Sequence, residues 1–147
     1  MAELAKDLQE KFVLYQLLNQ RLEEIKQHAT IIQHKLLEFE TSKNALIELK
    51  DVKADSEMLI PLGSGLFTHG KSGSQEKILV DLGAGIIAKK SLEDASGFID
   101  KKKKEVEDAV QVLQMEANAI TAKLNEIVPE LQKAAQDQEM EKGAGAG

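Results

Sequence analysis

Apolar residues recur every three or four positions over the first third of the chain, from Leu4 to about Leu46. One series repeats every seven residues and consists of Leu8, Tyr15, Leu22, Ala29 and Leu36. A companion series, interrupted by Lys11, consists of Leu4, Leu18, Ile25, Ile32, Phe39 and Leu46. These are the a and d positions of a heptad, and neither Gly nor Pro occurs before Pro61. The pattern predicts one long helix whose apolar stripe must pack against another helix.

A second heptad pattern begins at Ser91-Leu92-Glu93-Asp94, which has the form of a helix-capping box. Its seven-residue series consists of Leu92, Ile99, Val106, Leu113, Ile120, Ile127 and Ala134, with companions Val110, Ala117, Leu124 and Leu131. Because the two predicted helices are similar in length and joined by about forty residues, we expect them to fold back on each other. Pro129 should kink or interrupt the second helix near its end.

The middle of the chain changes from a helical to a strand-like period and contains an internal repeat. Residues 60–67, Ile-Pro-Leu-Gly-Ser-Gly-Leu-Phe, match residues 80–87, Val-Asp-Leu-Gly-Ala-Gly-Ile-Ile. Each unit is typical of a strand, a glycine turn and a second strand. The predicted fold is therefore α+β and mostly α: a long antiparallel two-helix coiled coil with two β-hairpins at its hub end. The expected parts are an N-terminal helix (1–51), two hairpins forming an assembly hub (52–90), a C-terminal helix (91–142) and a flexible tail (143–147).

The predicted hairpins are too apolar to face solvent. A lone hairpin is marginally stable in water, and four short strands leave unpaired edges. We therefore expect these strands to pair with strands of other subunits. The predicted oligomerisation residues are Leu59, Ile60, Leu62, Leu66, Phe67, Ile78, Leu79, Val80, Leu82, Ile86 and Ile87.

Composition narrows the possible partners. The formal net charge is −6, which argues against nucleic acid because phosphate binding needs a basic face. The chain has no Cys, and no apolar run is long enough to span a bilayer or to act as a signal peptide. The expectation is a cytoplasmic protein without a membrane partner.

Motifs that suggest chemistry are weak. Residues 65–72 match the phosphate-loop pattern G-x-x-x-x-G-K-[ST], but Lys71-Ser72 is followed by Gly73-Ser74, a turn, where a phosphate loop needs a helix. The histidines are scattered, and the run of lysines at 101–104 is typical of a solvated helix face, with a docking patch for an acidic partner as the alternative. We therefore expect no catalytic, cofactor or metal site, and no enzymatic activity.

The free end of the first helix carries apolar side chains outside the heptad seam. Phe12, Val13, Leu14 and Leu17 occupy outward or flanking positions. The same end of the second helix contains Val128 and Leu131. An exposed apolar surface on a solvated arm favours a binding role, although a wide helix face or a contact with a neighbouring arm is the alternative. The predicted client-binding residues are Phe12, Val13, Leu17, Val128 and Leu131.

The order of a long helix, two glycine-hinged hairpins and a returning helix resembles the alpha-type subunit of prefoldin, a hexameric chaperone. The residues that carry the resemblance are 59–67, 78–85 and 90–95. The resemblance implies two alpha and four beta subunits on a β-barrel platform, with arms that hold unfolded proteins without ATP and deliver them to a group II chaperonin. Pro129 departs from the family pattern. The alternative is a structural coiled-coil adaptor that assembles through the same hub and binds one defined folded partner.

Overall fold

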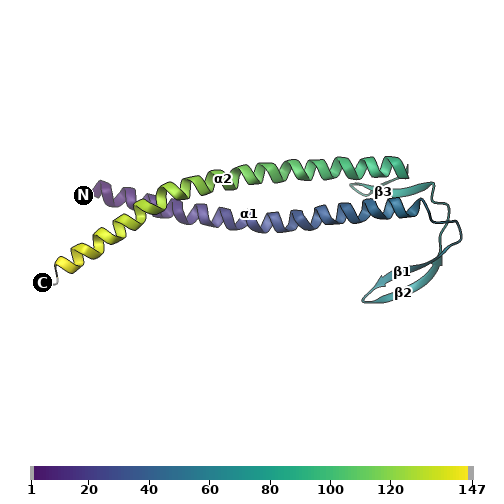
Figure 1. The fold of residues 1–147 in the computed structure, drawn as a ribbon, viewed down its shortest axis with the longest axis horizontal. Helices are drawn as coiled ribbons and strands as arrows, with labels where there is room; N and C mark the ends of the chain where they lie inside the picture. The colour runs from purple at the N-terminus through teal and green to yellow at the C-terminus, as the bar shows by residue number, and fades with distance from the viewer. Residues whose placement is uncertain (1, 146–147) are drawn as a thin grey trace. The chain divides into compact units, whose positions relative to one another are not determined.

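The computed structural model describes residues 2–145 and contains two long helices with four strands between them (Figure 1). The elements are α1 (Ala2–Leu49), β1 (Glu57–Gly63), β2 (Leu66–Lys71), β3 (Lys77–Gly83), β4 (Ile86–Ser91) and α2 (Leu92–Ala144). The fold class expected from the sequence is confirmed. The chain divides into two compact units, which we call the arm unit (residues 1–32 and 108–147) and the hairpin unit (33–107).

In the arm unit, α1 and α2 run antiparallel along an apolar seam. Ile25, Ile120 and Ile127 are buried there. Every heptad position predicted from the sequence in this unit is at least half-buried, with the exception of Leu4, which is 70% exposed. The heptad repeat therefore determines which face of each helix packs.

Pro129 was expected to kink or interrupt α2, and the interruption does not occur. The helix continues through it to Ala144. Proline lacks the N–H that would bond to the carbonyl of Asn125, so one helical hydrogen bond is missing. Ile127, which is 3% exposed, packs α2 before the proline, and the half-buried Leu131 packs it afterwards. The helix also includes Gly143 and Ala144 of the predicted flexible tail, whereas residues 146–147 lie outside the described part of the chain.

In the hairpin unit, Leu46 on α1 and Ala95 on α2 are both buried. Lys43 contacts Asp100 at 2.6 Å, and Lys103 contacts Glu40 at 3.5 Å. The predicted cap is confirmed, because the backbone N–H of Asp94 donates to the Ser91 hydroxyl at 3.1 Å. This bond satisfies a donor that the first turn of α2 would otherwise leave free.

The two hairpins share one backbone design. β1 pairs antiparallel with β2 from Glu57↔Lys71 to Gly63↔Leu66, and β3 pairs with β4 from Lys77↔Ser91 to Gly83↔Ile86. Each has an irregularity two residues before the same kind of turn. The turn residues Ser64-Gly65 and Ala84-Gly85 all have positive φ, from 51° to 80°, as a two-residue type I′ turn requires. The hairpin repeat expected from the sequence is therefore confirmed.

A clasp of hydrogen bonds ties the end of the first hairpin to the segment that leads into it. Ser72 is 3% exposed, and its hydroxyl donates to the carbonyl of Lys53 at 2.9 Å and accepts from the Ser56 N–H at 3.0 Å. The backbone groups of Ser72 also bond to Asp55 and Ser56, each at 2.8 Å. The clasp fixes where β1 and β2 start and end.

Candidate functional site

The first hairpin, formed by β1 and β2, exposes apolar side chains on both faces. Leu59 and Phe67 lie on one face and are 60% and 59% exposed, while Ile60 on the other is 44% exposed. Of the eleven predicted oligomerisation residues, nine are exposed and two are half-buried. The exposed ones are Leu59, Ile60, Leu62, Leu66, Phe67, Leu79, Leu82, Ile86 and Ile87; the half-buried ones are Ile78 and Val80. An exposed apolar surface of this size is typical of a protein–protein interface.

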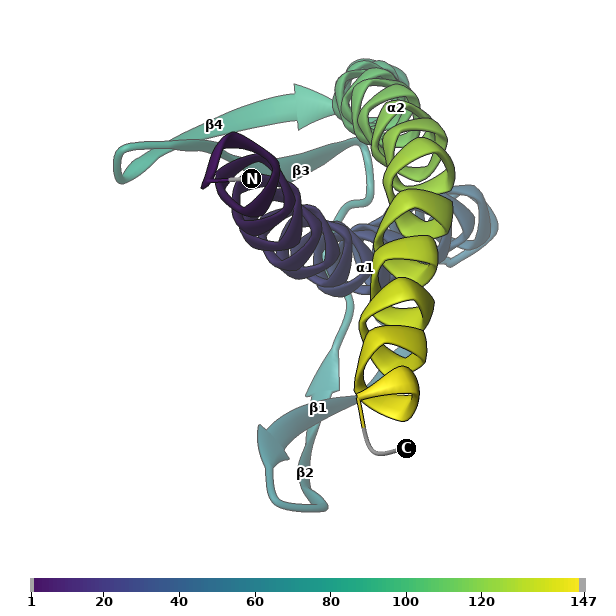
Figure 2. The same cartoon turned by 90° about the vertical axis from the view of Figure 1, so that its left-hand side faces the viewer.

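Both hairpins also have open strand edges. Within residues 2–145, β1 pairs only with β2 and β3 only with β4, so each sheet has two strands. Figure 2 shows the two hairpins as separate ribbons in the hairpin unit. Unpaired backbone N–H and C=O groups at such edges form hydrogen bonds readily with strands from another chain. Apolar faces and open edges together make the hairpins a candidate assembly surface.

The second hairpin differs, because one of its faces is partly covered within the chain. Ile78, Val80, Ala88 and Lys90 alternate along β3 and β4 and are all half-buried. The ammonium of Lys90 lies 5.9 Å from the ring centroid of Phe98 on α2. This hairpin therefore exposes mainly its opposite face, which contains Leu79 and Ile87.

The sequence that imitates a phosphate loop has a different structural context. Residues 66–71 form β2, and the next element after Lys71 and Ser72 is β3 rather than a helix. The Ser72 hydroxyl, which would bind a metal ion in a phosphate loop, is used in the clasp. After Lys71 and Ser72, the chain therefore lacks the helix N-terminus that a phosphate loop uses to bind phosphate.

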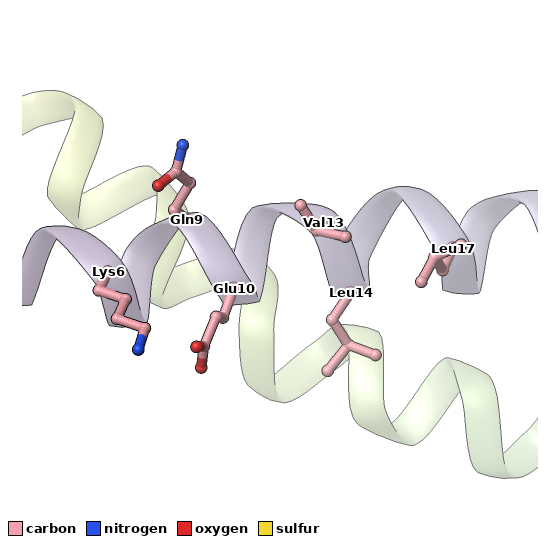
Figure 3. Close-up of a pocket in the computed structure, with 6 residues that line it drawn as sticks. All are labelled: Lys6, Gln9, Glu10, Val13, Leu14 and Leu17. Carbon is pink, nitrogen blue, oxygen red and sulfur yellow. The ribbon is translucent and has the colours of Figure 1, made fainter.

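The arm unit carries the second candidate surface, and it lies on α1. A groove of about 440 Å³ is lined by Val13, Leu14 and Leu17 on successive turns. Figure 3 shows them beside the side chains that border the groove, Lys6, Gln9 and Glu10. Val13 and Leu17 are 50% and 57% exposed. The groove is shallow and mostly apolar, and it suits weak contacts with apolar side chains.

The predicted client-binding residues do not all share this groove. Phe12 is exposed but stacks on the seam residue Tyr15, with ring centroids 6.5 Å apart. Val128 and Leu131 are half-buried. The set therefore splits into two exposed groove residues, one exposed aromatic ring beside the seam and two half-buried residues on α2. The predicted client-binding residues did not include Leu14, although it lines the groove. Leu14 lies one heptad after Asp7 and one heptad before Arg21, so it shares their position beside the seam.

Ion pairs across the arm seam set the electrostatics of the helix pair. The guanidinium of Arg21 donates two hydrogen bonds to the Glu116 carboxylate, at 2.6 and 3.0 Å. Glu116 raises the pKa of Arg21, and Arg21 lowers the pKa of Glu116 below its ordinary value. Lys11, which interrupts the apolar series, bridges Glu130 at 2.5 Å and Asp7 at 3.0 Å, and both carboxylates raise its pKa. These shifts keep Arg21, Glu116 and Lys11 charged near neutral pH.

Other candidate sites carry little chemistry. His28, His34 and His69 are exposed, and the part of the chain that the structure describes contains no group of three His, Asp or Glu side chains able to hold a metal ion. Three of the four lysines at 101–104 are exposed, while Lys103 pairs with Glu40. None of the helices between residues 2 and 145 has an apolar stretch of the length needed to cross a membrane.

Comparison with known proteins gives consistent results. The family model described as "Prefoldin subunit" matches residues 18–137. "Prefoldin subunit alpha 1" of Methanocaldococcus jannaschii is 31% identical over 143 residues, which cover 95% of this chain and 98% of that protein. Among solved structures, a chain of filamentous PFD from the same organism aligns with a TM-score of 0.73 at 20% identity, covering 80% of this chain and 97% of that one. The prefoldin beta subunit from Thermococcus strain KS-1 aligns with a TM-score of 0.54 at 19% identity, covering 87% and 91%. The structural alignments show a shared fold.

Proposed function

This chain belongs to the prefoldin alpha subunit family, and we propose that it acts as an ATP-independent holdase that captures unfolded proteins on its arm. As a member of this family it is a chaperone subunit and not an enzyme. We further propose that it assembles with beta-type subunits as a hexamer of two alpha and four beta chains. In this proposal the complex works in the cytoplasm and delivers its clients to a group II chaperonin.

The observation that carries the proposal is the pair of solvent-exposed apolar hairpins. Nine of the eleven predicted oligomerisation residues are exposed in the single chain. Burying each such side chain contributes roughly 1.5–3 kcal/mol, so a surface of this size strongly favours association. Open strand edges supply the hydrogen bonds that a partner hairpin needs. The two-hairpin pattern supports an alpha-type position in the assembly.

The arm groove supports the holdase part of the proposal. Val13, Leu14 and Leu17 offer apolar contacts without a deep cavity, and Phe12 adds an exposed ring nearby in the sequence. Such contacts are individually weak and unspecific in shape. Several arms that hold one unfolded chain would raise the effective concentration, so that weak contacts suffice and the client can later leave.

The test is a light-scattering assay of an unrelated denatured protein, with and without the assembled complex. Replacing Val13→Ser together with Leu17→Ser, or Phe12→Ser with Leu17→Ser, should reduce protection against aggregation about tenfold, since two apolar contacts are lost on every copy of the arm. Circular dichroism and sedimentation should show unchanged helicity and an intact hexamer.

The matched control replaces exposed apolar residues of the same unit outside the groove. Val112 and Met115 are 65% and 72% exposed on α2, so Val112→Ser with Met115→Ser changes apolar exposure by a similar amount. This control should keep full protection. Equal loss in both variants would contradict a client site on α1. An assembly that binds one folded protein but protects no denatured client would support the adaptor alternative.

A further inference from the structure

The ends of α1 and α2 diverge in the arm unit and leave a second groove between them. Figures 1 and 2 both show the first turns of α1 and the last turns of α2 moving apart. The groove has a volume of about 760 Å³, and its apolar side chains include Leu4, Leu8 and Ala134. All three hold heptad positions, but Leu4 is 70% exposed whereas Leu8 is half-buried. The apolar stripe therefore continues beyond the point at which the helices cover each other.

The walls of this groove are acidic. They carry four carboxylates, from Asp7, Glu130, Asp137 and Glu141, against two ammonium groups. Lys11 already bridges Asp7 and Glu130. Asp137 and Glu141 follow each other one turn apart on α2, and neither forms an ion pair with any residue from 2 to 145. Lys133, which also forms no ion pair with residues 2–145, lies on the same wall, so the α2 wall of the groove keeps a net negative charge.

The backbone chemistry of the groove favours a helical occupant. Its walls are two α-helices, whose backbone N–H and C=O groups are bonded within each helix, so they offer few hydrogen-bond partners to an extended segment. A helix satisfies its own backbone and presents apolar side chains at i, i+3, i+4 and i+7, which is the usual way to fill a groove of this kind. Charge complementarity then favours lysine or arginine beside the apolar stripe.

We propose that this groove captures amphipathic helical segments of non-native proteins in which lysine or arginine flanks the apolar stripe. The inference rests on the holdase function proposed above and names the class of client segment. The apolar side chains of the segment contact Leu4, Leu8 and Ala134, and its cationic groups contact Asp137 and Glu141. Leu4 is then covered by the client in place of the second helix of the arm.

The test measures binding of two labelled peptides to the assembled complex by fluorescence anisotropy. Both peptides have the same length and apolar positions, and one carries lysine and the other glutamate beside the stripe. The lysine peptide should bind about tenfold more tightly, and the ratio should fall as salt is added, because the charges of the groove wall are exposed. Equal affinities of the two peptides would overturn the proposal.

Variants locate the effect in the groove. Asp137→Lys with Glu141→Lys should weaken the lysine peptide roughly five- to tenfold, as expected for two exposed ion pairs. Asp108→Lys with Glu139→Lys changes the net charge by the same amount, but these residues do not line the groove, so the preference should persist. Equal loss in both variants would overturn the proposal in favour of a general electrostatic field.

A third variant, Leu4→Ser, tests the apolar contact with little risk to the fold, because Leu4 is already 70% exposed. It should weaken both peptides. An unchanged affinity would overturn the proposal that peptides bind in this groove, and would show that they bind through charge alone. Protection of a denatured client is measured in parallel: a complex that protects nothing contradicts the holdase function, whereas a complex that protects clients but binds both peptides equally contradicts only this inference.

Discussion

The two hairpins have the same backbone but different surroundings. Their registers coincide when residue numbers are shifted by twenty, so that Leu59 corresponds to Leu79 and Phe67 to Ile87. Both turns use two residues with positive φ. Yet β1 is exposed at every position, whereas β3 is half-buried at Ile78 and Val80. The glycine-small-glycine turn thus determines the shape of each hairpin, while the alternating side chains determine what covers it.

One position shows how this difference arises. Gly70 on β2 corresponds to Lys90 on β4. A Cβ at Gly70 would lie 2.6 Å from Cδ1 of Ile60, so the glycine leaves room for Ile60 to lie across its own hairpin. Lys90 instead extends to Phe98 on α2. The second hairpin is therefore attached to the helix of its own chain, whereas the first leaves both faces exposed.

The largest effect is expected on assembly through the first hairpin. Leu59→Lys with Phe67→Lys places two charges on an apolar face that is exposed in the single chain. Loss of two buried side chains in the interface, at roughly 1.5–3 kcal/mol each, should raise the dissociation concentration of the complex about a hundredfold or more. Sedimentation velocity measures this change. An assembly that survives at the original concentration would show that the first hairpin is not an interface.

An intermediate effect is expected on the stability of the hairpins, from the face that contains Ile60 in the first and Val80 in the second. Val80→Ser should lower the opening free energy of β3 and β4 by about 1–3 kcal/mol, because Val80 is half-buried within the chain. The corresponding Ile60→Ser should change the opening free energy of the isolated chain by less than about 0.5 kcal/mol, because Ile60 is 44% exposed. Hydrogen exchange of the strand amides measures both. Equal effects would mean that the hairpins are equally covered in the single chain.

The smallest effect tests what the hairpins share. Gly65→Ala and Gly85→Ala each force an alanine into positive φ, at 80° and 75°, which costs about 1 kcal/mol. No side chain lies within 4 Å of either added Cβ, so the strain should be the whole effect and should be the same in both hairpins. Thermal unfolding of the two variants should give equal shifts. Clearly unequal shifts would show that the turns differ in their contacts and not only in sequence.

Much of this architecture follows from the heptad periodicity of the apolar residues and from the glycines at the turns. The seven-residue series predicted the buried stripe of both helices, and the glycine pairs predicted both turns. Pro129 could not be judged in the same way, because whether a helix continues through a proline depends on packing such as that of Ile127. Leu4 is a second position at which the sequence misleads. Its heptad position predicts burial, but Leu4 is exposed because the helices diverge before they cover it.

The candidate client site was predictable only in part, because a list of apolar residues does not say which of them share a face. Val13 and Leu17, four residues apart, line one groove, whereas Phe12 lies beside Tyr15. Counting outward from the hairpins predicts that residues 128–131 of the second helix lie beside Phe12, which agrees with the ion pair between Lys11 and Glu130. Which side chain in that range pairs with Lys11 was not predictable, because it depends on the exact rotation of the two helices.

The pairing of Arg21 with Glu116 has a consequence for how α1 and α2 are aligned along their length. A heptad repeat tolerates slippage by seven residues, because apolar residues recur at nearly every step. Slippage of α2 by one heptad in either direction would bring Arg21 opposite Ala109 or Lys123 in place of a carboxylate. Both alternatives lose the two-pronged hydrogen bond, and one adds repulsion between like charges. The pair therefore favours the observed alignment of α1 and α2 in the arm unit over alignments shifted by one heptad.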